Sequence, residues 1–90
     1  MITPDFETRS EVDIVKWGAS GYARHESTEV LCLAWVDDSG ATHLWTRGDA
    51  PPQKLFDAIA RGELFEAHNA AFERLVWYWI CHKRFGWPDV

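Results

Sequence analysis

With 90 residues, the chain is long enough for one small domain, and its 47% hydrophobic share and six Trp residues exclude a disordered protein. A net charge of −5 argues against tight, sequence-independent binding to phosphates by basic side chains, although bound Mg²⁺ would reverse the charge of an acidic site. The sequence has no run of 18 apolar residues and no signal pattern, so we expect a cytoplasmic protein without a membrane partner.

The first predicted element is a strand from residue 2 to residue 7 or 8. Alternation places Pro4 and Phe6 on one face of it and Asp5 and Glu7 on the other. The two carboxylates are about 7 Å apart along such a strand, where like charges repel. This arrangement favours a hard cation with oxygen ligands, and exposed acids at a strand end are the alternative.

The next part of the chain predicts a long loop followed by a hairpin. Residues 9–29 are polar, and we expect a loop with one helical turn around Val12 to Trp17; loops of this length tend to be functional. "EVLCLAWV" (29–36) and "ATHLWT" (41–46) flank the turn sequence "DDSG" and predict a hairpin. With the first strand, it makes an antiparallel three-stranded meander.

The last third of the chain predicts a helix, a strand and a second helix. "GDAPPQKLFDAIARGE" has Asp49 as a candidate cap, two prolines for the first turn and Gly62 as a stop. "LFEAH" (64–68) is a short strand candidate. "NAAFERLVWYWICHKRFGWP" begins with Asn69 as N-cap and repeats apolar residues with helical period until Gly86.

The predicted element order is therefore β-β-β-α-β-α in a single α/β domain over residues 1–90. A right-handed crossover from the hairpin makes the strand at 64–68 parallel to one of the others. A three-stranded meander extended by a parallel strand, with two main helices on the faces, is the opening of a ribonuclease H-like mixed sheet.

Glu73 is the candidate for a third carboxylate beside Asp5 and Glu7. It lies in the first turn of the second helix, about 100° from Phe72 around the helix axis and on the margin of the apolar stripe, so it can face along the sheet surface toward the first strand. The alternative is an acid favoured there only by the helix dipole.

Other polar and aromatic residues give weaker signals. No histidine spacing supports zinc, and we expect His25, His43 and His82 at the surface. His68 next to the cap is either a hydrogen-bonded structural residue or part of a site. Three tryptophans could stack on bases, but their spacing favours core packing: Trp45, Trp77 and Trp79. Cys32 and Cys81 are predicted to be core thiols rather than a disulfide or a zinc pair.

Longer stretches of the chain resemble a known family. "DFETRSEVDIVKWGASGYARHESTEVLCLAW", "LWTRGDAPPQKLFDAIARGELFEAHNAAFERLVW" and "RFGWP" resemble the N-terminal 3′–5′ exonuclease region of phage-type family A DNA polymerases. The likeness covers essentially the whole chain. "DFET" is similar to the first motif, Asp-x-Glu, of the DEDD nuclease superfamily, and "HNAAFE" is similar to the second.

The resemblance implies a proofreading nuclease acting in DNA replication. It makes Asp5, Glu7 and Glu73 catalytic ligands of two Mg²⁺ or Mn²⁺ ions, which would hydrolyse phosphodiester bonds at the 3′ end of single-stranded DNA. It also implies nucleic-acid contacts for five residues: Thr8, Trp17, Tyr22, His68 and Asn69.

The sequence departs from the family at three points. Glu73 replaces the more usual Asp, Pro4 replaces an apolar strand residue, and no His or Tyr is followed four residues later by Asp, as the third motif requires. We therefore expect a partial exonuclease domain that lacks the strand and helix of the third motif, and weak metal binding with little or no hydrolysis by the 90 residues alone.

Missing elements of that kind would leave an open sheet edge and apolar helix surface. We expect self-association, or docking of a second chain that completes the sheet. Two further interpretations remain: a non-catalytic ribonuclease H-like remnant that serves as a binding or assembly module, and a different nuclease class that uses the same acids.

Overall fold

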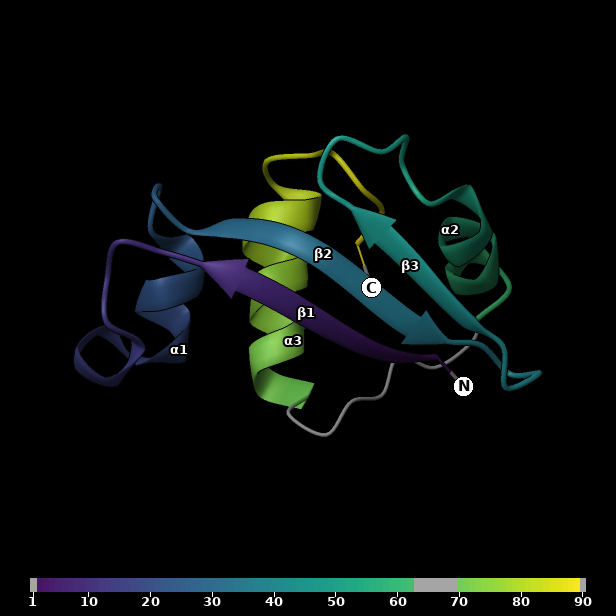
Figure 1. Ribbon diagram of the computed structural model, residues 1–90, viewed down its shortest axis with the longest axis horizontal. Coiled ribbons are helices and arrows are strands. Elements are labelled where there is room, and N and C mark those ends of the chain that lie inside the picture. Colours follow the sequence, from purple (N-terminus) through teal and green to yellow (C-terminus); the bar gives the residue numbers. More distant parts are fainter. Residues whose placement is uncertain (1, 63–69, 90) are drawn as a thin grey trace.

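Three antiparallel strands form the centre of the fold in a computed structural model, which describes residues 2–62 and 70–89 (Figure 1). They are β1 (Thr3–Arg9), β2 (Glu29–Val36) and β3 (Thr42–Thr46), and they lie side by side in the order β1-β2-β3. Both neighbouring pairs are antiparallel. The predicted meander is confirmed.

The register between β1 and β2 has one irregularity. Glu7 lies opposite Cys32 and Thr8 lies opposite Val30, so Leu31 is an extra residue in β2. A bulge of this kind changes which side chains of the bulged strand face each side of the sheet. β2 reads as a continuous apolar run because both faces carry apolar residues: Leu33 and Trp35 are buried, and Cys32 and Ala34 are half-buried on the other face.

The prediction of a long loop between β1 and β2 is wrong, because most of that segment is helical. Helix α1 (Ile14–Arg24) is capped by Asp13, whose side chain accepts a hydrogen bond of 2.9 Å from the Val15 N–H. Gly18 interrupts the helix with φ 72° and ψ 166°. Polar, partly exposed residues and this break hid the helical period in the sequence.

Helix α2 (Gln53–Ala60) confirms the predicted helix before Gly62. Its N-cap is Pro52, which offers no side-chain hydrogen bond. Asp49, the predicted cap, instead accepts a hydrogen bond of 2.9 Å from the backbone N–H of Thr46 in the turn after β3.

The last predicted helix is also present, in two forms. Helix α3 (Ala70–Val76) continues directly into the π-helical segment η1 (Trp77–His82). Gly86, with φ 76°, follows the helical end. The predicted strand at 64–68 and the predicted cap Asn69 lie outside the described residues.

The described residues thus form a mixed α/β fold with the element order β1-α1-β2-β3-α2-α3-η1. The additional helix α1 changes the predicted order β-β-β-α-β-α. None of the helices in residues 2–62 and 70–89 has the length and apolar character needed to cross a lipid bilayer.

An aromatic cluster around Trp87 fills one end of the core. The ring centroid of Trp87 lies 4.9 Å from that of Trp45, 5.4 Å from that of Phe56 and 5.5 Å from that of Trp77. All of these side chains are buried except Phe56, which is half-buried. The prediction that Trp45 and Trp77 pack in the core is confirmed, and Trp79 packs half-buried against the same core.

The two cysteines are free thiols in different environments. Cys81 is fully buried in the core, and this burial raises the pKa of its thiol. Cys32 is half-buried on β2. The core placement predicted for both therefore holds fully for Cys81 alone.

The sheet has one covered and one open face. Helix α3 crosses behind the sheet in Figure 1, and strand residues such as Phe6 and Leu33 are buried on that side. Within the described part of the chain, no helix covers the opposite face (Figure 1). Val36 and Leu44 lie on this open face with 38% and 65% of their surface exposed.

Candidate functional site

Two carboxylates of β1 point to the open side of the sheet. Pro4 and Phe6 are buried, whereas Asp5 and Glu7 are exposed, as the alternation of the sequence predicts. Pro4 is accommodated because β1 is an outer strand of the described sheet, where a missing N–H need not leave a neighbour unpaired. The two carboxylates are therefore on one face, separated by about 7 Å along the strand.

Glu73 reaches the same edge of the sheet from helix α3. Glu73 lies in the first turn of this helix, and only 6% of the residue is exposed. Such burial is unusual for an ionisable side chain. The Oε2 atom of Glu73 has no hydrogen-bond partner among the described residues. A buried carboxylate oxygen without a partner carries a large desolvation cost, which a bound proton or cation would relieve.

The surroundings of Glu73 disfavour its charged form. Burial raises the pKa of Glu73 to about 7, and the charges of Asp5 and then Glu7 push it in the same direction. The backbone N–H of Phe6 faces the carboxyl group and partly offsets the rise. The three predicted acids are thus close enough for their charges to interact, and Glu73 is the buried one of the three.

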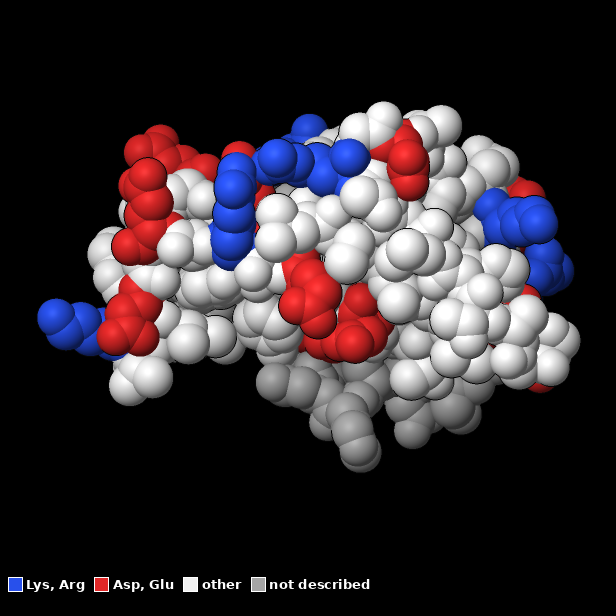
Figure 2. All heavy atoms as spheres, in the orientation of Figure 1, with Lys and Arg blue, Asp and Glu red and all other residues white. Residues whose placement is uncertain are grey.

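Three carboxylates are suitable ligands for a hard divalent cation, but in this structure they do not surround a common point. Acidic side chains gather in the middle of the face shown in Figure 2. Within residues 2–62 and 70–89, no three Asp, Glu, His or Cys side chains are close enough to count as a formed metal site. Rotation of the exposed side chains of Asp5 and Glu7 toward Glu73 would be needed to share one ion.

Three predicted nucleic-acid residues fall in two places. Thr8 Oγ1 and Tyr22 Oη lie 2.9 Å apart and link the end of β1 to α1, and the Tyr22 ring packs 6.1 Å from that of Phe72 on α3. Trp17 stands apart from this pair, with 53% of its surface exposed and its ring 5.2 Å from that of His25. His68 and Asn69 lie outside the described residues.

The three other histidines have structural partners. His25, His43 and His82 are half-buried rather than fully exposed, and each ring hydrogen-bonds at 2.7–2.8 Å to one neighbour, respectively Ser27, Asp37 and the Trp87 carbonyl. The predicted surface position is refined by these contacts: each ring is partly exposed and hydrogen-bonded to a neighbour.

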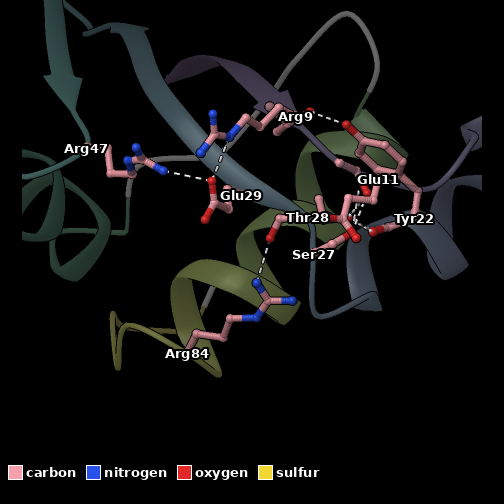
Figure 3. Close-up of polar contacts among 10 residues, drawn as sticks. Arg9, Glu11, Tyr22, Ser27, Thr28, Glu29, Arg47 and Arg84 are labelled. Atoms are coloured by element: carbon pink, nitrogen blue, oxygen red, sulfur yellow. Dashed lines mark hydrogen bonds and ion pairs between the residues drawn. The ribbon is translucent and has the colours of Figure 1, made fainter.

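A polar network at the start of β2 was missed in the sequence (Figure 3). Arg84 donates hydrogen bonds of 2.6 Å to the carbonyl oxygens of Thr28 and His25, which ties the C-terminal end of the fold to this segment. Glu29 Oε2 accepts hydrogen bonds of 2.7 Å from both Arg9 and Arg47. The only sequence signal was the opposition of Arg9 and Glu29 at the ends of two paired strands.

Comparison with known proteins does not assign this site. No protein-family model matches the chain, and no curated protein and no solved structure match it.

Proposed function

We propose that the chain is the N-terminal part of a metal-dependent 3′–5′ exonuclease of the DEDD type, with a ribonuclease H-like fold, from a phage-type DNA polymerase. The observation that carries this proposal is the buried carboxyl of Glu73, which has an unpartnered oxygen beside the two carboxylates of β1. Charge repulsion among three acids is costly without a cation. A group of neighbouring carboxylates is typical of a site that binds a divalent ion.

The proposed roles follow from position. Asp5 and Glu7 are exposed and can reach a cation from the open side, while Glu73 would bind it from the buried side. The Thr8–Tyr22 pair holds the end of β1 beside them and would orient the terminal nucleotide. Mg²⁺ or Mn²⁺, when bound, would polarise the phosphate and activate the attacking water.

We expect metal binding with little or no hydrolysis by the 90 residues alone. The residues that resemble the first two nuclease motifs are present, but the sequence has no His or Tyr followed four residues later by Asp. Loss of a general base alone costs about 10²–10⁴ in rate.

The test is calorimetric titration of Mn²⁺ into the wild type and into the double variant Asp5→Asn/Glu7→Gln. A matched control, Glu11→Gln/Glu26→Gln, removes the same charge from exposed acids elsewhere. We expect binding in the wild type and the control and none in the double variant. Equal binding by all three proteins contradicts the site, and a 3′-labelled single-stranded DNA added afterwards measures any trimming.

A second candidate is a binding or assembly module of ribonuclease H-like origin. The exposed apolar side chains of Val36 and Leu44 on the open sheet face favour it, because such a surface gains from being covered by another copy or a second chain. Sedimentation at increasing concentration tests it. A monomer at every concentration excludes self-association, and absence of Mn²⁺ binding would make this the leading function.

A further inference from the structure

We propose that Arg9 and Arg47, held together by Glu29, bind the phosphodiester backbone of a single-stranded nucleic acid. This arginine pair would lie beside the acidic group formed by Asp5, Glu7 and Glu73. This inference rests on the proposed nuclease function and names the part of the surface that would hold its substrate. The resemblance to the exonuclease family implies no role for these two arginines.

The cluster is assembled from three separate parts of the chain (Figure 3). Arg9 ends β1 and lies directly opposite Glu29, the first residue of β2, while Arg47 follows β3. Arg9 Nε and Arg47 Nη1 each lie 2.7 Å from the same atom, Glu29 Oε2. The sheet therefore fixes two guanidinium groups next to each other.

The cluster retains one positive charge and many hydrogen-bond donors. Two guanidinium groups face one carboxylate, and the hydrogen bond from Arg9 lowers the pKa of Glu29, which favours its ionised form. Among the described residues, each guanidinium uses a single N–H group for this contact. The remaining N–H groups are available to an anion, because the side chains of Arg9 and Arg47 are 61% and 50% exposed.

A purely structural role explains the cluster less well. Exposed ion pairs contribute little to stability, so one arginine would serve Glu29 almost as well as two. Guanidinium groups match phosphate oxygens in geometry and bind them in a bidentate manner. An arginine pair with one shared carboxylate is thus a better fit to a phosphate than to a second protein acid.

The position of the cluster gives it a defined relation to the acids. Arg9 and Glu7 are two residues apart on the same exposed side of β1, about 7 Å along the strand. Figure 2 shows basic side chains next to the central acidic group on this face. A DNA strand whose 3′-terminal phosphodiester lies at Asp5 and Glu7 can place its next phosphate on the two arginines. A cation bound at these carboxylates would then offset their repulsion of the DNA phosphates.

The test measures binding of a 5′-fluorescein-labelled oligothymidylate by fluorescence anisotropy over a series of NaCl concentrations with Mn²⁺ present. The proteins are the wild type, Arg9→Gln/Arg47→Gln, and the charge-matched control Lys54→Gln/Lys83→Gln, whose lysines are exposed on other elements. We expect the arginine variant to bind on the order of tenfold more weakly, with the slope of log K against log [NaCl] reduced by about 0.7, the value for one phosphate of a single strand. The control should match the wild type.

A second variant separates phosphate recognition from folding. Arg9→Lys/Arg47→Lys keeps both charges but loses the fork of donors, so it should retain the salt slope and bind several-fold more weakly than the wild type. Circular dichroism and the thermal midpoint confirm that each variant is folded. Equal affinity and slope in the wild type and the Gln variant overturn the proposal, and so does equal weakening in the lysine control.

Calorimetry with Mn²⁺ on the same proteins distinguishes the two proposals. The arginine variant keeps all three acids, so metal binding should be unchanged while DNA binding falls. A wild type that binds Mn²⁺ but no oligonucleotide overturns the arginine site and leaves the metal site standing. A wild type that binds DNA through the arginines but no Mn²⁺ supports the arginine site and contradicts the nuclease function.

Discussion

The buried carboxyl of Glu73 lies close enough to the exposed Asp5 on β1 for the charge of Asp5 to raise its pKa, although the two residues are far apart in the chain. After burial itself, the charge of Asp5 is the largest cause of the rise in the pKa of Glu73 to about 7. The folded protein therefore holds a carboxyl group that is partly protonated near neutral pH.

Replacing Glu73 with Gln should remove a pH dependence of stability. The folded state binds the Glu73 proton more tightly than the unfolded state does, so the wild type should lose about 1–3 kcal/mol of unfolding free energy as pH rises from about 4.5 to about 7. Glu73→Gln should be flatter across this range and more stable than the wild type at about pH 8. Urea denaturation in EDTA at several pH values measures both, and identical pH profiles contradict the burial of a charge.

Thr28 should be important for the start of β2. It is fully buried, and its Oγ1 lies 2.7 Å from Ser10 Oγ and 2.5 Å from the carbonyl oxygen of Tyr22. Thr28→Val keeps the shape but removes both contacts of the buried hydroxyl, which should cost about 1–3 kcal/mol in urea denaturation. The control Thr42→Val, at an exposed position of β3, should change stability by less than about 0.5 kcal/mol.

Gly18→Ala should be destabilising although there is room for the new methyl group. No atom lies within 4 Å of the position that its Cβ would take, so the cost comes from the backbone, which has φ 72° and ψ 166°. This region is essentially restricted to glycine, and we expect a loss of about 1–3 kcal/mol. Ser20→Ala, at an exposed position of the same helix, should be neutral or slightly stabilising in the same measurement. A neutral Gly18→Ala would mean that α1 continues without the interruption.

Trp87→Ala should be among the most damaging single changes. Trp87 is only 4% exposed and contacts the rings of Trp45, Phe56 and Trp77, so its removal should cost about 3–5 kcal/mol through lost burial and a cavity. Trp17→Ala, at a residue with 53% exposure, is the comparison and should cost about 1 kcal/mol or less. Thermal unfolding followed by circular dichroism compares the two; equal midpoints would contradict the placement of the core.

The strands were predictable because their signals are local. Alternation around Phe6 placed Asp5 and Glu7 on the open side of β1, and the turn residues between β2 and β3 marked the hairpin. Helix α1 was not, because Gly18 splits it into pieces too short to show a helical period.

The site was predictable only as a list of acids. Helical phase placed Glu73 at the margin of the apolar stripe, but its burial and unpartnered oxygen depend on how α3 packs against β1. The meeting of Arg9 with Arg47 depends on a third strand and on strand register, which no local pattern contains.

The extra residue Leu31 has a consequence for how this gene could vary. A one-residue deletion within a strand ordinarily turns every later side chain to the wrong side of the sheet. Here Leu31 has no partner in β1, and Val30 before it and Leu33 after it are both buried on the same face. Loss of codon 31 would leave an alternating strand that still directs Glu29 outward to Arg9. Among the positions of β2, this is the one where a shortened relative could keep the same two faces.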